Sequence, residues 1–243
     1  MQMHEYDTAL GDPAKAEAIV LHEAAMSAFQ RGNVEVARRF MSRACACAEA
    51  PAMWHRNHAE ILDRSGDSEA AEVAARLALQ RDPDCANAWE TLGTILVQRG
   101  TLEESCACYE KAVQIDATFV QALNNLAVTL DRLGRLKAAE VRYKQVLRLV
   151  PESPDIQLNF ATLLGELGRY REGLEIAQQV LDRHPNLMRA HAVTSELTRN
   201  LRRRGSAARR VERVLVVGSD QSEAPARRSS ISSQGRVHAV ARQ

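Results

Sequence analysis

Residues 86–119 read ANAWETLGTILVQRGTLEESCACYEKAVQIDATF. Their apolar and small side chains recur every three or four positions in two stripes, which is the spacing of two helix faces. The first stripe consists of Trp89, Leu92, Gly93 and Leu96, and the second consists of Ser105, Tyr109, Ala112 and Ile115. Gly100 lies between them, where a left-handed residue ends a helix without a Cβ penalty. A turn this short predicts that the two helices pack antiparallel.

The glycine at the turn belongs to a series with a fixed interval of 34 residues. The series is Gly32, Gly66, Gly100, Gly134 and Gly168. Prolines repeat the same interval at Pro83, Pro151 and Pro185, with Ala117 in the one missing slot. A period of this length indicates a stacked array of repeats. Because one unit cannot bury its apolar face alone, neighbouring units are expected to share one continuous core.

Two columns of small residues predict how the paired helices pack. The column in the first helices is Ala25, Ala59, Gly93, Ala127 and Ala161, and the column in the second helices is Ala37, Ala71, Ser105, Ala139 and Gly173. Small side chains in both columns would let the two helix backbones approach closely.

These residues resemble the tetratricopeptide repeat family. Residues 89–93 match its opening W-x2-L-G, Ser105…Tyr109 and Ala139…Tyr143 approximate its A-x3-F, and the prolines match its closing proline. The resemblance covers about residues 18–183. It implies an all-α, right-handed superhelix of stacked antiparallel helix pairs, with about five 34-residue units and a C-terminal capping helix.

We expect four segments along the chain. They are an N-terminal tail (1–13), the repeat array (14–187), a capping helix (188–204) and a basic, largely disordered tail (205–243). Within the last segment, Val214–Val217 is a strand-like run that could be the stump of a second domain. Residues 199–243 hold 11 arginines against three acidic residues, a net charge of +8, which leaves −7 for residues 1–198. The basic tail either stays solvated or folds back onto the acidic array and competes with partners.

Composition disfavours several classes of function. No run of 18 apolar residues exists, so we expect no membrane span, and no secretory signal is visible, so a cytoplasmic location is the default. No aromatic residue follows Tyr170, so stacking on nucleic-acid bases by the arginine-rich tail has no support. No catalytic or phosphate-binding motif appears, so we expect neither an enzyme nor a cofactor.

The cysteines and histidines offer one candidate metal site. Cys45, Cys47, His55 and His58 superficially mimic a zinc spacing. Helical residues two positions apart point about 200° away from each other, so one helical C-x-C does not easily close around an ion. We therefore expect free cysteines that pack as small apolar residues, and no metal.

First helices line the inner, concave wall of such a superhelix. We expect a peptide-binding groove on this wall, formed by Arg56, Asn57, Glu60, Asn87, Glu90, Thr91, Gln121, Asn124, Asn125, Asp155 and Asn159. One column, which we call the amide column, holds Asn57, Thr91, Asn125 and Asn159. An exposed amide can donate to and accept from a peptide bond, so the column could clamp an extended backbone. The alternative is that these polar side chains only face water.

The amide column also resembles the asparagine ladder in the repeat region of O-linked N-acetylglucosamine transferase-like proteins of bacterial type, although no catalytic domain follows. The function we expect is a protein-interaction scaffold or adaptor that binds an extended, neutral or basic segment of a protein partner. The alternative is a substrate-recruiting region of a larger or split glycosyltransferase-type enzyme.

Overall fold

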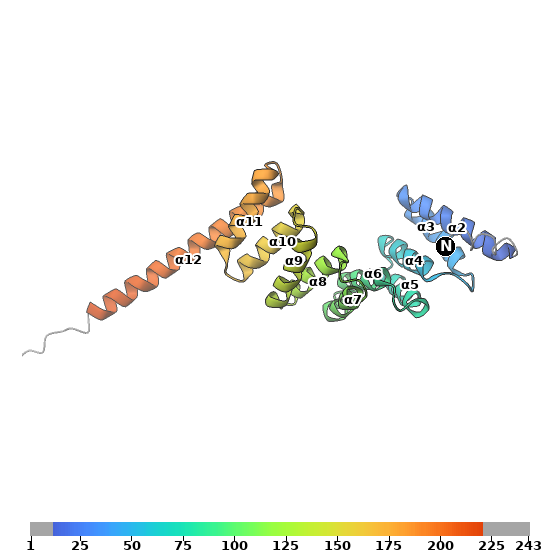
Figure 1. Ribbon diagram of the computed structural model, residues 1–243, viewed down its shortest axis with the longest axis horizontal. Helices are drawn as coiled ribbons and strands as arrows, with labels where there is room; N and C mark the ends of the chain where they lie inside the picture. The colour runs from blue at the N-terminus through green and yellow to red at the C-terminus, as the bar shows by residue number, and fades with distance from the viewer. Residues whose placement is uncertain (1–11, 221–243) are drawn as a thin grey trace, which may run out of the picture. The chain divides into compact units, whose positions relative to one another are not determined.

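The computed structural model describes residues 12–220, with side chains for residues 12–206. This part of the chain contains eleven α-helices and no strand. Ten helices form five antiparallel pairs (Figure 1): α2 (Pro13–Gln30) with α3 (Val34–Cys45), α4 (Ala52–Arg64) with α5 (Ser68–Arg81), α6 (Ala86–Gln98) with α7 (Leu102–Ile115), α8 (Val120–Arg132) with α9 (Leu136–Leu149), and α10 (Pro154–Glu166) with α11 (Tyr170–Arg183). The predicted all-α fold of stacked helix pairs is confirmed.

The turn within each pair uses the predicted glycine. Gly100 has a φ of +83°, in the left-handed region that other residues rarely adopt. The amide of Thr101 donates to the carbonyl of Leu96 at 3.0 Å, and the amide of Gly100 donates to Val97 at 3.1 Å. These bonds satisfy carbonyls at the end of α6 that have no partner within the helix. The four other glycines of the series have φ between 71° and 86°.

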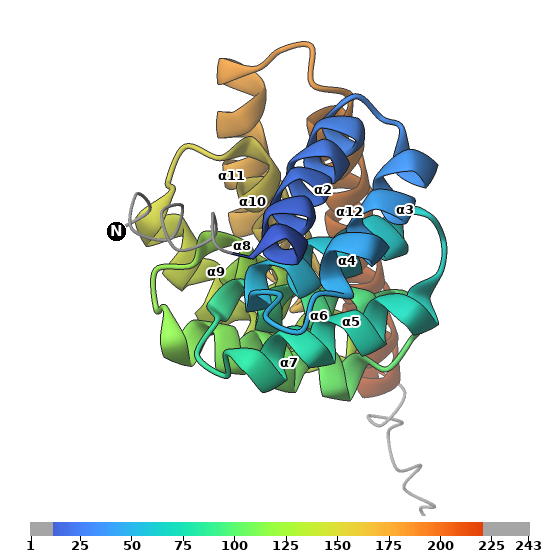
Figure 2. The same ribbon diagram turned by 90° about the vertical axis from the view of Figure 1, so that its right-hand side faces the viewer.

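The pairs stack so that each second helix contacts the first helix of the next pair (Figures 1 and 2). Successive first helices also touch each other directly, α4 with α6, α6 with α8 and α8 with α10. We call the surface formed by α4, α6, α8 and α10 the first-helix wall. Its continuity places polar side chains from several repeats next to one another.

Close helix approach explains the two columns of small residues. Within the pair α6 and α7, the hydroxyl of Ser105 donates to the carbonyl of Gly93 at 2.8 Å. Between α10 and α11, a Cβ atom added to Gly173 would lie 2.7 Å from the carbonyl oxygen of Ala161. The helices are therefore too close at these points for larger side chains, as the columns predicted.

One residue of the predicted core stripe is misplaced. Ser105, Tyr109 and Ala112 of α7 are buried, but Ile115 is 40% exposed and Val113 is buried instead. Val113 follows Tyr109 by four positions and so lies on the same helix face. Ile115 is the last residue of α7 and is exposed at the end of the helix.

The C-terminal helix differs most from the prediction. α12 runs from Met188 to Asp220, through Gly205 and the whole of Val214–Val217. The predicted strand is therefore wrong, and the helix does not end at residue 204. A lone strand would leave its backbone groups without partners, whereas a helix satisfies them internally. The disorder predicted after Asp220 falls on residues outside the described part of the chain.

The chain divides into two compact units between residues 198 and 199, and their described parts are residues 12–198 and 199–220. In the first unit, Ala190 and Leu197 are buried in a cluster with Ala161, Ala177 and Val180. The start of α12 thus covers the apolar face of the last pair. None of the described helices is long and apolar enough to cross a membrane.

Candidate functional site

A groove of about 340 Å³ opens on the first-helix wall, within the first compact unit. Its lining comes from α4, from α6, and from the start of α8, where Phe119 precedes the helix. Three successive first helices therefore contribute, and no second helix does. Six of the eleven residues predicted for the site line this groove: Arg56, Glu60, Asn87, Glu90, Thr91 and Gln121.

Proline carbonyls help to position the helices of this wall. The indole N–H of Trp89 donates to the carbonyl of Pro83 at 2.8 Å, which fixes the entry of the chain into α6. Six residues after the next closing proline, the amide of Gln157 donates to the carbonyl of Pro151 at 2.6 Å. The 34-residue period thus sets the direction of a first helix as well as its position.

Glu90 lines the groove and is only 7% exposed. Its Oε1 atom accepts three hydrogen bonds, from Thr94 Oγ1 at 3.1 Å, Gln121 Nε2 at 3.0 Å and Asn125 Nδ2 at 2.8 Å. The Tyr109 hydroxyl lies 3.1 Å from Thr94 Oγ1 and extends the network into the core. Burial raises the pKa of Glu90 although the three donors oppose this shift.

The amide column is not a free ladder. Asn57 is only 4% exposed, its Nδ2 lies 3.1 Å from Nε2 of His22, and its Oδ1 accepts from Arg56 at 2.5 Å. The Asn125 amide donates to Glu90, and the Asn159 oxygen accepts from Arg189. Asn57 and Asn125 therefore link successive first helices and Asn159 contacts α12, whereas the Thr91 hydroxyl donates to the carbonyl of Asn87 in its own helix at 2.8 Å. The expectation of a row of exposed amides is wrong at Asn57.

The remaining predicted residues lie outside the groove. Asp155 forms an ion pair with Arg189 at 3.0 Å, next to the contact of Arg189 with Asn159. Asn124 has a buried Oδ1 atom without a hydrogen-bond partner among the described residues. The structure therefore joins the part of the predicted site on α4, α6 and α8 and separates the part on α10.

A carboxyl pair on the same wall was not predicted. Asp131 of α8 and Glu166 of α10 lie near enough for each carboxyl group to influence the other, and the Oδ1 atom of Asp131 is buried without a hydrogen-bond partner among the described residues. Burial raises the pKa of both groups, and the neighbouring Asp131 raises that of Glu166 further. At the equivalent place two repeats earlier, the Gln98 amide donates to Asp63 at 2.8 Å. A search for polar pairs 35 residues apart would have found both.

The cysteine and histidine cluster has a packing role. The Nε2 atom of His58 lies 3.0 Å from the Ser42 hydroxyl, and burial lowers the pKa of this histidine. Burial also raises the pKa of Cys45 to about 12 and that of Cys108 to about 11, so both are protonated thiols near neutral pH. Within residues 12–206, no group of three or more His, Cys, Asp or Glu side chains is arranged to hold a metal ion.

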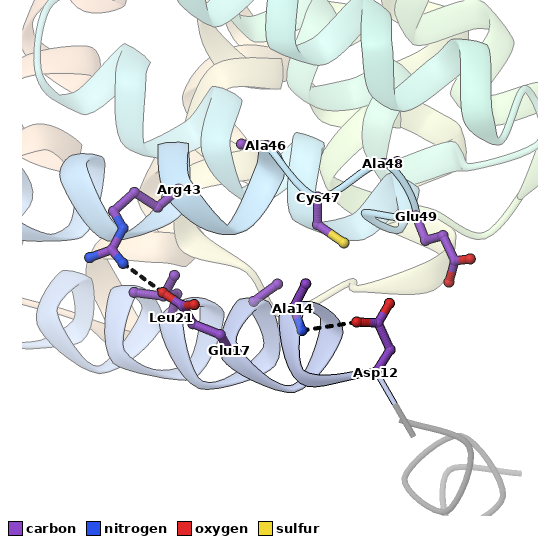
Figure 3. A pocket seen from close by; sticks show the side chains of 10 residues that line it. Asp12, Ala14, Glu17, Leu21, Arg43, Ala46, Cys47, Ala48 and Glu49 are labelled. Atoms are coloured by element: carbon purple, nitrogen blue, oxygen red, sulfur yellow. Dashed lines mark hydrogen bonds and ion pairs between the residues drawn. The ribbon is translucent and has the colours of Figure 1, made fainter. Parts of the chain in front are cut away.

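A second hollow, of about 570 Å³, lies between α2 and the end of α3 (Figure 3). The hollow is open because four of its lining residues are alanines with small side chains, namely Ala14, Ala18, Ala46 and Ala48. Arg43 spans it to Glu17 with an ion pair of 2.7 Å. This hollow is lined by the first helix pair and its flanking residues alone, whereas three successive repeats line the groove on the first-helix wall.

Comparisons with known proteins agree with the repeat architecture. Two models of the tetratricopeptide repeat match residues 84–152 and 132–197. Protein FlbA of Caulobacter vibrioides is 34% identical over 119 residues, which is 47% of this chain and 20% of that protein. Tetratricopeptide repeat protein 8 of Homo sapiens is 26% identical, over 51% of this chain and 22% of that protein. The chain thus spans about a fifth of the length of these relatives.

Solved structures share the fold at low sequence identity. A tetratricopeptide repeat protein from Parabacteroides merdae superposes with a TM-score of 0.70 and 17% identity, over 83% of this chain and 80% of that one. YrrB, described as a tetratricopeptide repeat protein with an unusual peptide-binding site, gives a TM-score of 0.64 and 18% identity, over 78% and 97%. Residues 84–197 therefore match the tetratricopeptide repeat, and the helix pairs of this chain have the fold of tetratricopeptide repeat proteins.

Proposed function

We propose that this chain is a non-catalytic scaffold or adaptor that captures an extended segment of a partner protein in the groove of the first-helix wall. The groove itself carries the proposal, because three successive repeats line one continuous hollow of about 340 Å³. Ligand sites in proteins range over about 300–1,000 Å³, so this volume suits a few residues of a bound chain.

The polar lining supports recognition of a peptide backbone. Asn87 and Gln121 are exposed at the groove, and each amide offers both donors and an acceptor. An extended peptide presents one N–H and one C=O per residue, so such side chains can hold it with little sequence preference. Asn57, Asn125 and Asn159 brace the wall in this proposal, and Asn87 and Gln121 touch the partner.

The similarity in fold to a peptide-binding repeat protein also supports peptide capture. YrrB is described as having a peptide-binding site, and it shares the stacked helix pairs of this chain. Repeat arrays of this kind use the surface created by stacking for binding. The predicted cytoplasmic location stays a prediction.

The alternative of a substrate-recruiting part of a glycosyltransferase-type enzyme has lost its main support. It rested on Val214–Val217 as the strand of a second domain, and these residues lie in α12. No observation on the described residues now favours that alternative over the scaffold.

Photo-crosslinking from inside the groove tests the proposal. Benzoylphenylalanine placed at residue 87 should crosslink to a partner in native lysate, at one contiguous stretch of that partner. The same group at residue 107, exposed on α7 and outside the groove, is the control. The purified partner stretch should then bind Asn87→Tyr at least 10-fold more weakly than Ala107→Tyr, because the tyrosine occupies the groove.

Two results would contradict the proposal. One is a partner that crosslinks equally from both positions. The other is equal affinity of the two tyrosine variants, after circular dichroism has shown the same helix content in both. Either result would place binding on another surface.

A further inference from the structure

The lining of the groove includes a carboxylate without a counter-ion. Glu90 receives hydrogen bonds only from the neutral side chains of Thr94, Gln121 and Asn125, all at its Oε1 atom. Its Oε2 atom has no hydrogen-bond partner among the described residues, and no lysine or arginine there lies within ion-pair distance. Carboxylates this buried are usually paired with a cation.

The arginines that line the groove are engaged elsewhere. Arg56 Nη1 lies 3.8 Å from Glu60, and its Nη2 donates to Asn57 at 2.5 Å. The Arg64 guanidinium lies over the ring of Phe29, 5.6 Å from the ring centroid. Neither side chain neutralises Glu90, and the charge that acts on Glu90 most clearly is the like charge of Glu60.

A second unsatisfied acceptor lines the same groove. Asp63 accepts from Gln98 at Oδ2, but its Oδ1 atom is buried without a hydrogen-bond partner among the described residues. The groove therefore offers acceptor atoms on Glu90 and Asp63, and no cationic side chain within residues 12–206 forms an ion pair with either carboxylate. A ligand that brings a positive charge and several N–H donors would complement both.

We propose that the groove binds a basic side chain of the captured segment, with its cationic head ion-paired to Glu90 at Oε2. Arginine suits the site better than lysine, because a guanidinium carries five donors and can also reach a second acceptor such as Asp63. The inference rests on the proposed function, since it assigns one subsite of the same groove. A partner with a basic residue in an extended stretch is the occupant it requires.

Three synthetic peptides test the subsite. Each peptide is eleven residues long and consists of Ser, Ala and Gly except at its central position. That position is arginine, lysine or citrulline, the neutral analogue of arginine. The readout is a two-dimensional NMR titration of the full chain. The side-chain amides of Gln121 and Asn125 serve as local reporters, because both donate to Glu90.

The arginine peptide should shift both reporter signals and bind about 10-fold or more tightly than the citrulline peptide, as expected for a charge-assisted contact. Lysine should fall between them. Glu90→Gln keeps an oxygen for the three donors and should abolish the preference. Glu110→Gln removes the same charge from an exposed position on α7, and this variant should retain the preference for arginine.

Different failures have different meanings. Equal binding of the three peptides at the reporters would overturn the subsite and leave peptide capture intact. Binding of the arginine peptide that Glu90→Gln leaves unchanged would also overturn it. If no peptide shifts the reporters even at millimolar concentration, both the subsite and the proposed function fail.

Discussion

Glu90 and Asn125 lie 35 residues apart in the chain and meet side to side on α6 and α8. The same separation joins His22 to Asn57 and Asp63 to Gln98. Each of these bonds links one repeat to the next. These polar residues of the first-helix wall therefore stabilise the stacking, and the Asn87 side chain, which makes none of these bonds, remains available to a ligand.

Replacing Glu166 by glutamine should remove a loss of folding stability that occurs as the pH rises. Burial raises the pKa of Asp131 and of Glu166. Groups with a raised folded-state pKa stabilise most below the ordinary carboxyl pKa of about 4, and this stabilisation is lost as the pH rises through the raised values. Glu166→Gln recreates the Asp63–Gln98 arrangement. It should match the wild type near pH 4 and be more stable by about 0.5 kcal/mol near pH 8.

Thermal melts followed by circular dichroism from pH 4 to pH 8 measure this difference. Glu172→Gln is a control of opposite sign, because Arg169 lowers the pKa of Glu172 and that stabilisation is present at the higher pH. A constant difference between Glu166→Gln and the wild type across the range would contradict the raised pKa values of the pair.

Gly173→Ala should destabilise the array although alanine favours helix. The added Cβ would lie 2.7 Å from the carbonyl oxygen of Ala161, which is backbone and cannot rotate away. Overpacking costs about 1–3 kcal/mol and the gain in helix propensity is about 1 kcal/mol, so we expect a net loss of about 1 kcal/mol. Gly205→Ala is the control, because no atom lies within 4 Å of its added Cβ. A urea melt of Gly173→Ala equal to that of the wild type would contradict this account.

At the scale of the helix, the sequence determines where elements begin and end, because each repeat needs a residue with positive φ at the turn between its two helices. Gly66 and Gly134 could be placed from the period alone, since only a left-handed residue continues the chain there. Val214–Val217 could not, because four aliphatic residues suit a strand and a helix equally. The partners of Asn57 could not either, since they depend on which side chain the preceding helix presents at position 22.

The start of α5 offers a test of helix capping. Asp67 accepts a hydrogen bond from the amide of Ala70 at 3.1 Å, whereas the equivalent Thr101 and Arg135 make no such bond. Asp67→Ala should therefore lower the stability by about 1 kcal/mol in a urea melt, and Asp67→Asn should cost only a few tenths. Equal losses in the two variants would indicate that the charge of Asp67, and not its cap, is what matters.

At the scale of the whole molecule, opposite charges are separated along the chain. Residues 199–243 carry a net +8 and residues 1–198 carry −7, while the groove holds a carboxylate that lacks a cation. Such a separation favours association with a basic partner and also favours the chain's own arginines as competitors. Binding of a basic partner and competition by the chain's own arginines both follow from the same electrostatic attraction, and the two can be measured separately.

We propose that the seven arginines of residues 205–243 compete for the acidic array, so deleting these residues should tighten binding of the arginine peptide by several fold. A chain of full length with those seven arginines changed to glutamine should gain as much affinity, which separates charge from length. The gain should shrink in 0.5 M salt, where screening shortens the reach of exposed charges. Unchanged or weaker binding at low salt would show that the tail does not compete, and the arginines would then act on a partner of their own.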